Sequence, residues 1–379
     1  MKIIPGGVTS PIGFLANGIA CGLKRSGRLD LALIYSVVKA KSFGLFTKNK
    51  IQAAPVKLSK KHLKNGFSYA IIANSGNANC FTGSKGFKAA VSMSEVIAKN
   101  LSIDDDQVLV ASTGIIGKQL PVSKITQKAS ELVSGLSKDN NLLAAKAIMT
   151  TDTKPKEVAA TVNIHGSKVT IGAMAKGVGM IAPDLATMLC FITTDAAIDK
   201  IALKQALKEA VEVSFNSISI DGEMSTNDSV FVLANGLALN KEIKLNTKEY
   251  HVFLDALKYI CLTLSRLILK DAEGATKFIE ITVSKARTFE DAKKIAFRIA
   301  NSVLFKTAVF GQNQNFERII QAAGETLVDI KEEKIKLNLS DLKKSDVKVE
   351  LSLGLGKHSK TVYTCDLSKK YVDINAGYN

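Results

Sequence analysis

The segment from Lys176 to Thr193 could supply a nucleophile, because a turn containing glycine and proline delivers one threonine to the first position of an apolar run. Gly177 and Gly179 stand early in the turn, and a small Ala186 stands immediately before Thr187. A buried strand alone would not need two nearly adjacent glycines before it, whereas a backbone that folds sharply would. Thr187 is therefore a candidate nucleophile, and the alternative is a plain structural turn.

Cleavage of the Ala186–Thr187 bond would give Thr187 a second function. The residue would become a new N-terminus that carries a hydroxyl nucleophile and an amine base together. A free α-amino group has an unperturbed pKa near ~8, so a substantial fraction can act as a base at neutral pH. Such a site needs no histidine relay, and the chain has only four histidines. The cut would give two parts of similar size, 1–186 and 187–379.

The segment Ala111–Gly117 could form an oxyanion hole. A run rich in valine and leucine ends there in Ser112, Thr113 and Gly114, and the glycine exposes backbone N–H groups. Two neighbouring donors at a strand-to-turn junction can point at one oxygen, and each stabilises an oxyanion by about 3 kcal/mol. On spacing alone, an ordinary Ser-Thr-Gly turn remains the alternative.

Several polar clusters could bind a substrate. Asn74–Asn79 contains three amides, which could orient a polar substrate or brace backbone turns, and the spacing favours neither. Further clusters border apolar runs at Met149–Thr153, Asp221–Asp228 and Lys270–Lys277. Hydroxyls and a lysine suit carboxylates, and a carboxylate suits an amino group. Together these clusters could hold an amino acid, although each one alone could equally be a cap or a turn.

Nucleotide and metal sites are not expected. Gly177-Val-Gly179 lacks the third glycine of a dinucleotide fingerprint. Gly354–Ser359 lacks both the leading glycine and the hydroxyl directly after lysine of a P-loop. The five cysteines are scattered without a C-x-x-C pair, which favours a reduced compartment and gives no metal-like spacing with the histidines. We therefore predict no cofactor and no metal.

The charge composition argues against a nucleic-acid partner. The net charge is +16, but only six of the 51 basic residues are arginine, the lysines are dispersed, aromatic residues make up 6%, and tryptophan is absent. A solvated lysine-rich surface is the preferred interpretation, and its mild positive potential could help to gather an acidic substrate. The chain has neither an uninterrupted apolar span nor a recognisable signal or transit segment, so we expect a cytoplasmic protein without a membrane partner.

Short strands and amphipathic helices alternate without a regular βαβ rhythm, which predicts a layered α+β fold, not a doubly wound sheet. Asp199 is expected to cap its helix. The expected strands are Tyr69–Ala73, Val108–Ala111, Lys168–Gly172, Met188–Thr193 and Ser229–Leu233, and the expected helices are Lys88–Lys99, Ser123–Leu136, Asp199–Val213 and Tyr250–Lys270.

Taken together, the motifs resemble the ornithine acetyltransferases of arginine biosynthesis, a family also called bifunctional arginine biosynthesis proteins or glutamate N-acetyltransferases. The resemblance runs over nearly the whole chain. The motifs, in order, are Gly6–Pro11, Ala53–Val56, Asn74–Asn79, Ser112–Gly117, Thr150–Thr153, Lys176–Leu189, Ser225–Asp228, Asp271–Lys277 and Cys365–Ala376.

This resemblance implies a layered α/β sandwich related to the DmpA aminopeptidases. It implies a precursor that cuts itself before Thr187 into an α chain, 1–186, and a β chain, 187–379, which assemble as an α2β2 heterotetramer. It also implies that Thr187 accepts the acetyl group of N2-acetylornithine, releases ornithine, and passes the acetyl group to L-glutamate. Whether acetyl-CoA is a second donor stays open.

The resemblance also implies roles for individual residues. Thr113 and Gly114 would form the oxyanion hole. Thr150, Lys176, Thr187, Glu273 and Asn375 would bind substrate. Two alternatives remain, a related hydrolase that passes the acyl group to water and a non-enzymatic relative that stays one chain.

Three departures from the family pattern affect substrate affinity more than the type of reaction. The family tail usually carries a substrate-binding serine or threonine just beyond the position of Asn379, and this sequence has no residue there to make that contact. Gly311–Arg318 replaces the family's usual Asp-Pro-Asn-Trp-Gly pattern, although it keeps Asn315 and Arg318. Glu223 stands where an aspartate is common.

Overall fold

The computed structural model describes residues 1–182 and 188–377. The predicted cleavage residues Ala186 and Thr187 therefore lie outside the described residues, and so does Asn379.

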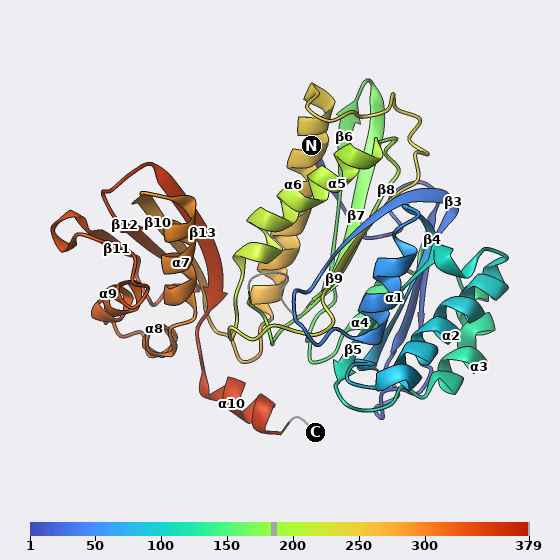
Figure 1. Ribbon diagram of the computed structural model, residues 1–379, viewed down its shortest axis with the longest axis horizontal. Coiled ribbons are helices and arrows are strands. Elements are labelled where there is room, and N and C mark those ends of the chain that lie inside the picture. Colours follow the sequence, from blue (N-terminus) through green and yellow to red (C-terminus); the bar gives the residue numbers. More distant parts are fainter. Residues whose placement is uncertain (183–187, 378–379) are drawn as a thin grey trace.

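A large mixed sheet forms the main body of the molecule (Figure 1). Its strands follow the order β1-β6-β7-β8-β9-β3-β4-β5, and β2 pairs with β3 beside this path. The β4–β5 and β8–β9 pairs are parallel, and the others are antiparallel. The strands are β1 (Lys2–Ile4), β2 (Phe14–Ile19), β3 (Leu31–Phe46), β4 (Phe67–Asn77), β5 (Val108–Ile115), β6 (Lys156–Ile164), β7 (Ser167–Lys176), β8 (Leu189–Thr194) and β9 (Ser229–Ala234).

Helices cover both faces of the large sheet (Figure 1). Alternate residues of β8 show the two layers, because Cys190 and Ile192 enter the buried cluster of α5 and α6 while Leu189 and Phe191 enter that of α4. At the other end of the sheet, α1, α2 and α3 pack in a third buried cluster. The helices are α1 (Ala54–His62), α2 (Gly83–Leu101), α3 (Val122–Ser134), α4 (Asn141–Ile148), α5 (Lys200–Val213) and α6 (Lys248–Lys270).

A smaller sheet, with its own helices and its own buried cluster, forms a second layered unit at one side of the molecule (Figure 1). Its strands follow the order β11-β12-β10-β13, and α7, α8 and α9 pack beside them. From β13 the chain leads into α10, which ends near the large body. The elements are β10 (Phe278–Ala286), α7 (Phe289–Ala300), α8 (Val303–Phe310), α9 (Glu317–Gly324), β11 (Lys336–Leu339), β12 (Asp346–Ser352), β13 (His358–Cys365) and α10 (Lys369–Ala376).

The predicted α/β layering is confirmed, and the predicted elements correspond to β4, β5, β7, β8, β9, α2, α3, α5 and α6. Their ends differ from the predicted ones by up to five residues, because β4, β5 and β7 run four residues further and α2 begins five residues earlier. Asp199 caps α5 as expected, accepting N–H bonds from Ile201 and Ala202. The long strand β3 and the whole small sheet were not predicted. β3 pairs with β4 over its first part and with β9 over its last part, so it joins the two halves of the large sheet.

Two predicted absences can be compared with the described part of the chain. There, no helix is long and apolar enough to cross a membrane. Nor do three or more histidine, cysteine, aspartate or glutamate side chains of those residues gather as a metal site would require. All five cysteines are buried free thiols.

Candidate active site

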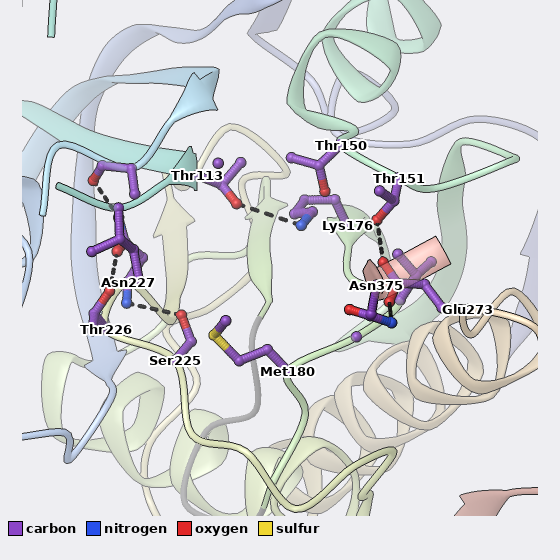
Figure 2. A pocket seen from close by; sticks show the side chains of 15 residues that line it. Thr113, Thr150, Thr151, Lys176, Met180, Ser225, Thr226, Asn227, Glu273 and Asn375 are labelled. Atoms are coloured by element: carbon purple, nitrogen blue, oxygen red, sulfur yellow. Dashed lines mark hydrogen bonds between the residues drawn. The ribbon is translucent and has the colours of Figure 1, made fainter. Parts of the chain in front are cut away.

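A cavity of about 130 Å³ brings together the six predicted site residues that the structure describes (Figure 2). They come from five separate stretches of the chain. Thr113 and Gly114 lie in β5, Thr150 follows α4, Lys176 ends β7, Glu273 follows α6 and Asn375 lies in α10. Also lining the cavity are Ala78, Ile116, Thr151, Val178, Gly179, Met180, Ser225, Thr226 and Asn227.

The strand register places the last residue of β7 beside the first residues of β8 and β9, at the end of the large sheet that borders this cavity. Lys176 of β7 pairs with Leu189 of β8, and Leu189 pairs with Ser229 of β9. The segments 225–227 and 177–180, which line the cavity, adjoin these strand ends. Asn227 connects these strand ends to β5, because its side-chain amide donates to the carbonyls of Ala78 (2.6 Å) and Ser112 (2.8 Å).

Gly114 occupies a position that only glycine fits. Its φ of +130° belongs to a region that residues with a Cβ rarely adopt. A Cβ there would lie 2.4 Å from the carbonyl carbon of Gly76 and 2.6 Å from the amide nitrogen of Asn77, on the paired strand β4. The glycine predicted to expose backbone donors is therefore also required for β4 and β5 to approach each other.

Lys176 is buried at the centre of the cavity wall, with 4% of its surface exposed. Its Nζ donates to the Oγ1 of Thr113 at 3.4 Å, so the lysine and the predicted oxyanion residue are in contact (Figure 2). Burial lowers the pKa of Lys176, while the negative charges of Asp152, Asp228 and Glu273 act in the opposite direction.

Among the negative charges that act on Lys176, Asp152 has the largest effect, and it belongs to a buried ionic cluster. Its Oδ1 lies 2.7 Å from the Nζ of Lys156, which also reaches an oxygen of Asp271 at 2.6 Å. Burial by itself would raise the pKa of Asp152, but the charges of Lys176 and Lys156, together with hydrogen bonds, outweigh it and lower that pKa to about 2. The same oxygen accepts the N–H of Gly177 at 2.9 Å. Asp152 thus fixes the backbone directly after Lys176.

Glu273 lines the same cavity as Lys176 and lies beside Thr151 and Asn375 (Figure 2). Its carboxylate accepts hydrogen bonds from the hydroxyl of Thr151 at 2.7 Å and from the side-chain amide of Asn375 at 2.9 Å. A Cβ on Gly179 would lie 2.6 Å from the Oε2 of Glu273, so the second glycine of the opening turn leaves room for this carboxylate. The cavity therefore presents a cation and an anion to a ligand.

The side-chain amides of Asn74, Asn77 and Asn79 all donate to backbone carbonyls, which decides between the two roles that their spacing allowed, bracing turns or orienting a substrate. Asn74 donates to the backbone carbonyl of Asn77, Asn77 donates to the carbonyls of Lys118 and Gln119, and Asn79 donates to that of Gly86. These amides brace backbone turns. They hold the end of β4 against β5, and so they support Gly114 indirectly.

Two aspartates hold the chain on either side of residues 183–187. Asp221 accepts the N–H groups of Met180 at 2.6 Å and Ile181 at 2.8 Å. Asp228 accepts the N–H of Met188 at 3.0 Å. Burial raises the pKa of Asp228 well above its usual range, and the hydrogen bond from Met188 acts the other way. One loop, 221–228, therefore anchors both flanks of the predicted cleavage segment.

Sequence reasoning did not predict the roles of Thr151, Asp152, Lys156 and Asp228. Asp152 and Asp228 stood inside polar clusters that had been recognised, but nothing in their spacing distinguished a buried counter-ion from a cap. Lys156 carried no signal, since lysine at the start of a strand is ordinarily solvated.

Chemically, this arrangement can bind a small zwitterion and stabilise negative charge. The ammonium of Lys176 suits a carboxylate, and the carboxylate of Glu273 suits an ammonium. Because the hydroxyl of Thr113 accepts a hydrogen bond from Lys176, its own proton remains free to donate.

Comparisons with known proteins agree on one family. The model of the ArgJ family matches residues 15–343 and 338–379. The arginine biosynthesis bifunctional protein ArgJ of Caldanaerobacter subterraneus subsp. tengcongensis is 42% identical, and the glutamate N-acetyltransferase of Methanocaldococcus jannaschii is 43% identical, each match covering 100% of both chains. Among solved structures, the ornithine acetyltransferase of Mycobacterium tuberculosis, crystallised in complex with ornithine, matches this chain with 40% sequence identity and a TM-score of 0.45. The match covers 48% of this chain and 97% of that chain.

The ionic cluster gives a prediction for pH dependence. The folded-state pKa of Asp152 is lowered to about 2, so its stabilising contribution is present above the unfolded value near ~4 and is lost as the pH falls through 2. Asp152→Asn should therefore lower the free energy of unfolding by about 2 kcal/mol or more at pH 7, and the difference from wild type should shrink at pH 3. Urea unfolding at both pH values measures this.

A matched control is Asp139→Asn, which removes an exposed aspartate. We expect it to change the free energy of unfolding by less than ~0.5 kcal/mol at either pH. A destabilisation by Asp152→Asn that is equal at pH 7 and pH 3 would contradict the assigned ionic role.

Proposed function

This chain belongs to the ArgJ family of arginine biosynthesis, and from that premise we propose that it transfers the acetyl group of N2-acetylornithine to L-glutamate. The observation that carries the proposal is the single cavity that Lys176 and Glu273 line together with Thr113 and Gly114. Such a cavity can hold an amino acid by both of its charges and stabilise an oxyanion at the same place.

We propose that the enzyme first cuts itself. In this step the Oγ of Thr187 attacks the carbonyl carbon of Ala186, the Ala186–Thr187 amide becomes an ester, and water hydrolyses the ester. The products are a carboxylate on Ala186 and a free α-amino group on Thr187. Support comes from the flanking anchors, because Asp228 fixes the amide of Met188, the residue bonded to Thr187. The two chains are then 1–186 and 187–379.

Acetyl transfer would follow in two half-reactions on Thr187. Its Oγ attacks the acetyl carbonyl of N2-acetylornithine, and its α-amino group takes the hydroxyl proton and delivers it to the departing nitrogen of ornithine. The amino group of glutamate then attacks the acetyl ester, and Thr187 recovers its proton. The Thr113 hydroxyl and the Gly114 N–H would stabilise the oxyanion in both halves.

The charged residues would orient the substrates. The buried ammonium of Lys176 would pair with a substrate carboxylate, and this pairing is strong because little water competes in the cavity. Glu273 would pair with an ammonium, with Thr151 and Asn375 holding its carboxylate in place. Thr150 lines the same cavity, and Asp152 accepts its backbone N–H at 2.9 Å. A cytoplasmic α2β2 assembly of the processed chains is part of this proposal.

The decisive experiment follows ornithine release from N2-acetylornithine with and without L-glutamate. A transferase needs the acceptor to discharge the acetyl-enzyme, so glutamate should be required for sustained ornithine release and N-acetylglutamate should accumulate in equal amount. D-glutamate serves as the acceptor control. Ornithine release at the same rate without glutamate would instead identify the hydrolase that passes the acetyl group to water.

Self-cleavage predicts a change of chain length that depends on one hydroxyl. Purified wild-type protein should give two fragments of similar size on a denaturing gel, whereas Thr187→Ala should remain full length, because it has no Oγ to attack Ala186. Thr187→Ser keeps a hydroxyl and should still be cut. Wild-type protein that transfers acetyl groups while it stays one chain would disprove this step.

The oxyanion role of Thr113 predicts a loss in kcat. Removing the hydroxyl in Thr113→Val should lower kcat for acetyl exchange by about 10²-fold with a smaller change in KM, because the hydrogen bond strengthens only as negative charge develops. Thr113→Ser restores a donor and should recover most of the activity. A rise in KM alone would place Thr113 in ground-state substrate binding.

A further inference from the structure

A second cavity of about 510 Å³ adjoins the active-site cavity. Thr150 and Thr151 line both cavities, so the two spaces share a wall. Its most prominent feature is positive charge, contributed by Lys24, Arg25, Arg28 and Lys118. The remaining lining residues are Leu23, Ser26, Gly76, Asn77, Ile115, Gln119, Pro121 and Gly377.

The loop between β2 and β3 that carries three of these cations is held from within by a buried aspartate. Asp30 accepts N–H bonds from Cys21 (2.6 Å), Leu23 (2.6 Å) and Lys24 (2.9 Å). The Nζ of Lys24 donates to the carbonyl of Leu29 at 2.7 Å, which closes the loop. These hydrogen bonds fix the backbone of the basic loop, and with it the positions from which the basic side chains extend.

This loop lies directly beside the predicted oxyanion residues. A Cβ on Gly76 would lie 3.2 Å from the Cγ of Lys24, so the stem of that lysine passes over Gly76. Gly76 in turn pairs with Gly114 on β5. A ligand bound among the cations would therefore sit next to the place where the acyl group reacts.

The exposed cations of this cavity lack internal counter-charges. Arg25, Arg28 and Lys118 are exposed, and none of them forms an ion pair with a carboxylate of the described residues. Among the residues that the structure describes, the guanidinium of Arg28 donates to the hydroxyl of Ser26 alone. Unpaired cations that converge on a concave surface create a field that attracts anions.

Lys24 responds to the same field. Burial lowers its pKa to about 8, with the positive charges of Arg28 and Lys176 acting in the same direction and those of Asp30 and Asp152 opposing it. Because Lys176 belongs to the active-site cavity, the two cavities are also coupled electrostatically. A bound anion would favour the charged form of Lys24.

We propose that this cavity is a binding subsite for a phosphate-bearing anion. Two arginines supply planar forks that match phosphate oxygens, and two lysines supply compact charges beside them. Four cations exceed what one amino-acid carboxylate needs, whereas an oligophosphate carries several negative charges. The ligand could be the phosphate-bearing part of an acyl donor whose acyl group reaches Gly114, or a free oligophosphate. The acyl-donor form of the proposal rests on the proposed role of Gly114, whereas binding of the phosphate group itself does not depend on acetyl exchange.

The test measures binding of inorganic pyrophosphate by calorimetry at constant ionic strength. The cavity variant Arg25→Gln/Arg28→Gln/Lys118→Gln removes three exposed charges. A matched control, Lys331→Gln/Lys336→Gln/Lys357→Gln, removes three exposed charges near the small sheet. We expect Kd to rise about ten-fold or more in the cavity variant and less than about two-fold in the control. The single reversal Lys118→Glu should weaken binding in the same direction if the triple variant fails to fold.

Equal pyrophosphate affinity in the cavity variant and the control would overturn the proposal, and so would a higher KM for glutamate with unchanged pyrophosphate binding. Kinetics then identify the source of the phosphate. If acetyl-CoA acetylates glutamate and pyrophosphate competes with it, the ligand is an acyl donor. If pyrophosphate binds without competing, it is a free oligophosphate. Acetyl exchange from N2-acetylornithine should be unchanged in the cavity variant, and its absence from wild type would contradict the proposed function alone.

Discussion

Placing an ammonium group inside the protein is the constraint on which the rest of the site depends. Lys176 lies at the end of a buried strand with almost no exposure, and an uncompensated charge there would be strongly destabilising. Asp152 supplies the compensation, but a second buried charge needs partners of its own. Lys156 and the N–H of Gly177 provide them, and Asp271 then balances Lys156. One charged residue thus requires a network that spans three parts of the chain.

This network also determines the position of neighbouring groups. Asp152 accepts the N–H of Thr150, while Asp271 accepts that of Thr153, so the segment after α4 is fixed at both ends. Asp271 belongs to the same turn as Glu273, which places the cavity's anion at a defined distance from its cation. The same hydrogen bonds therefore compensate the buried charges and position the groups proposed to bind substrate. A substitution that breaks one of these bonds would disturb both.

Sequence patterns predicted about half of the local elements, and the predicted site residues that the structure describes line one cavity, but the patterns did not predict partnerships across the chain. The periodicity of α6 depends on neighbours in sequence, and the structure has that helix at Lys248–Lys270. The ion pair of Lys156 with Asp271 joins residues 115 positions apart, and only the fold brings them together. The amides of Asn74–Asn79 could not be assigned from spacing, because bracing a turn and binding a ligand require the same residue type.

The proposed cleavage site divides the chain within one sheet and does not separate two bodies. Strands β1 to β7 precede residue 186, while β8 and β9 follow it, and the register joins Lys176 to Leu189 across the division. β9 also pairs with β3, so strands of the second part are hydrogen-bonded on both sides to strands of the first (Figure 1). Breaking one peptide bond there would leave these ladders and the α5–α6 cluster intact. A boundary at Thr187 is therefore chemical, because a cut there would leave the strand pairing and the buried clusters of the fold in place.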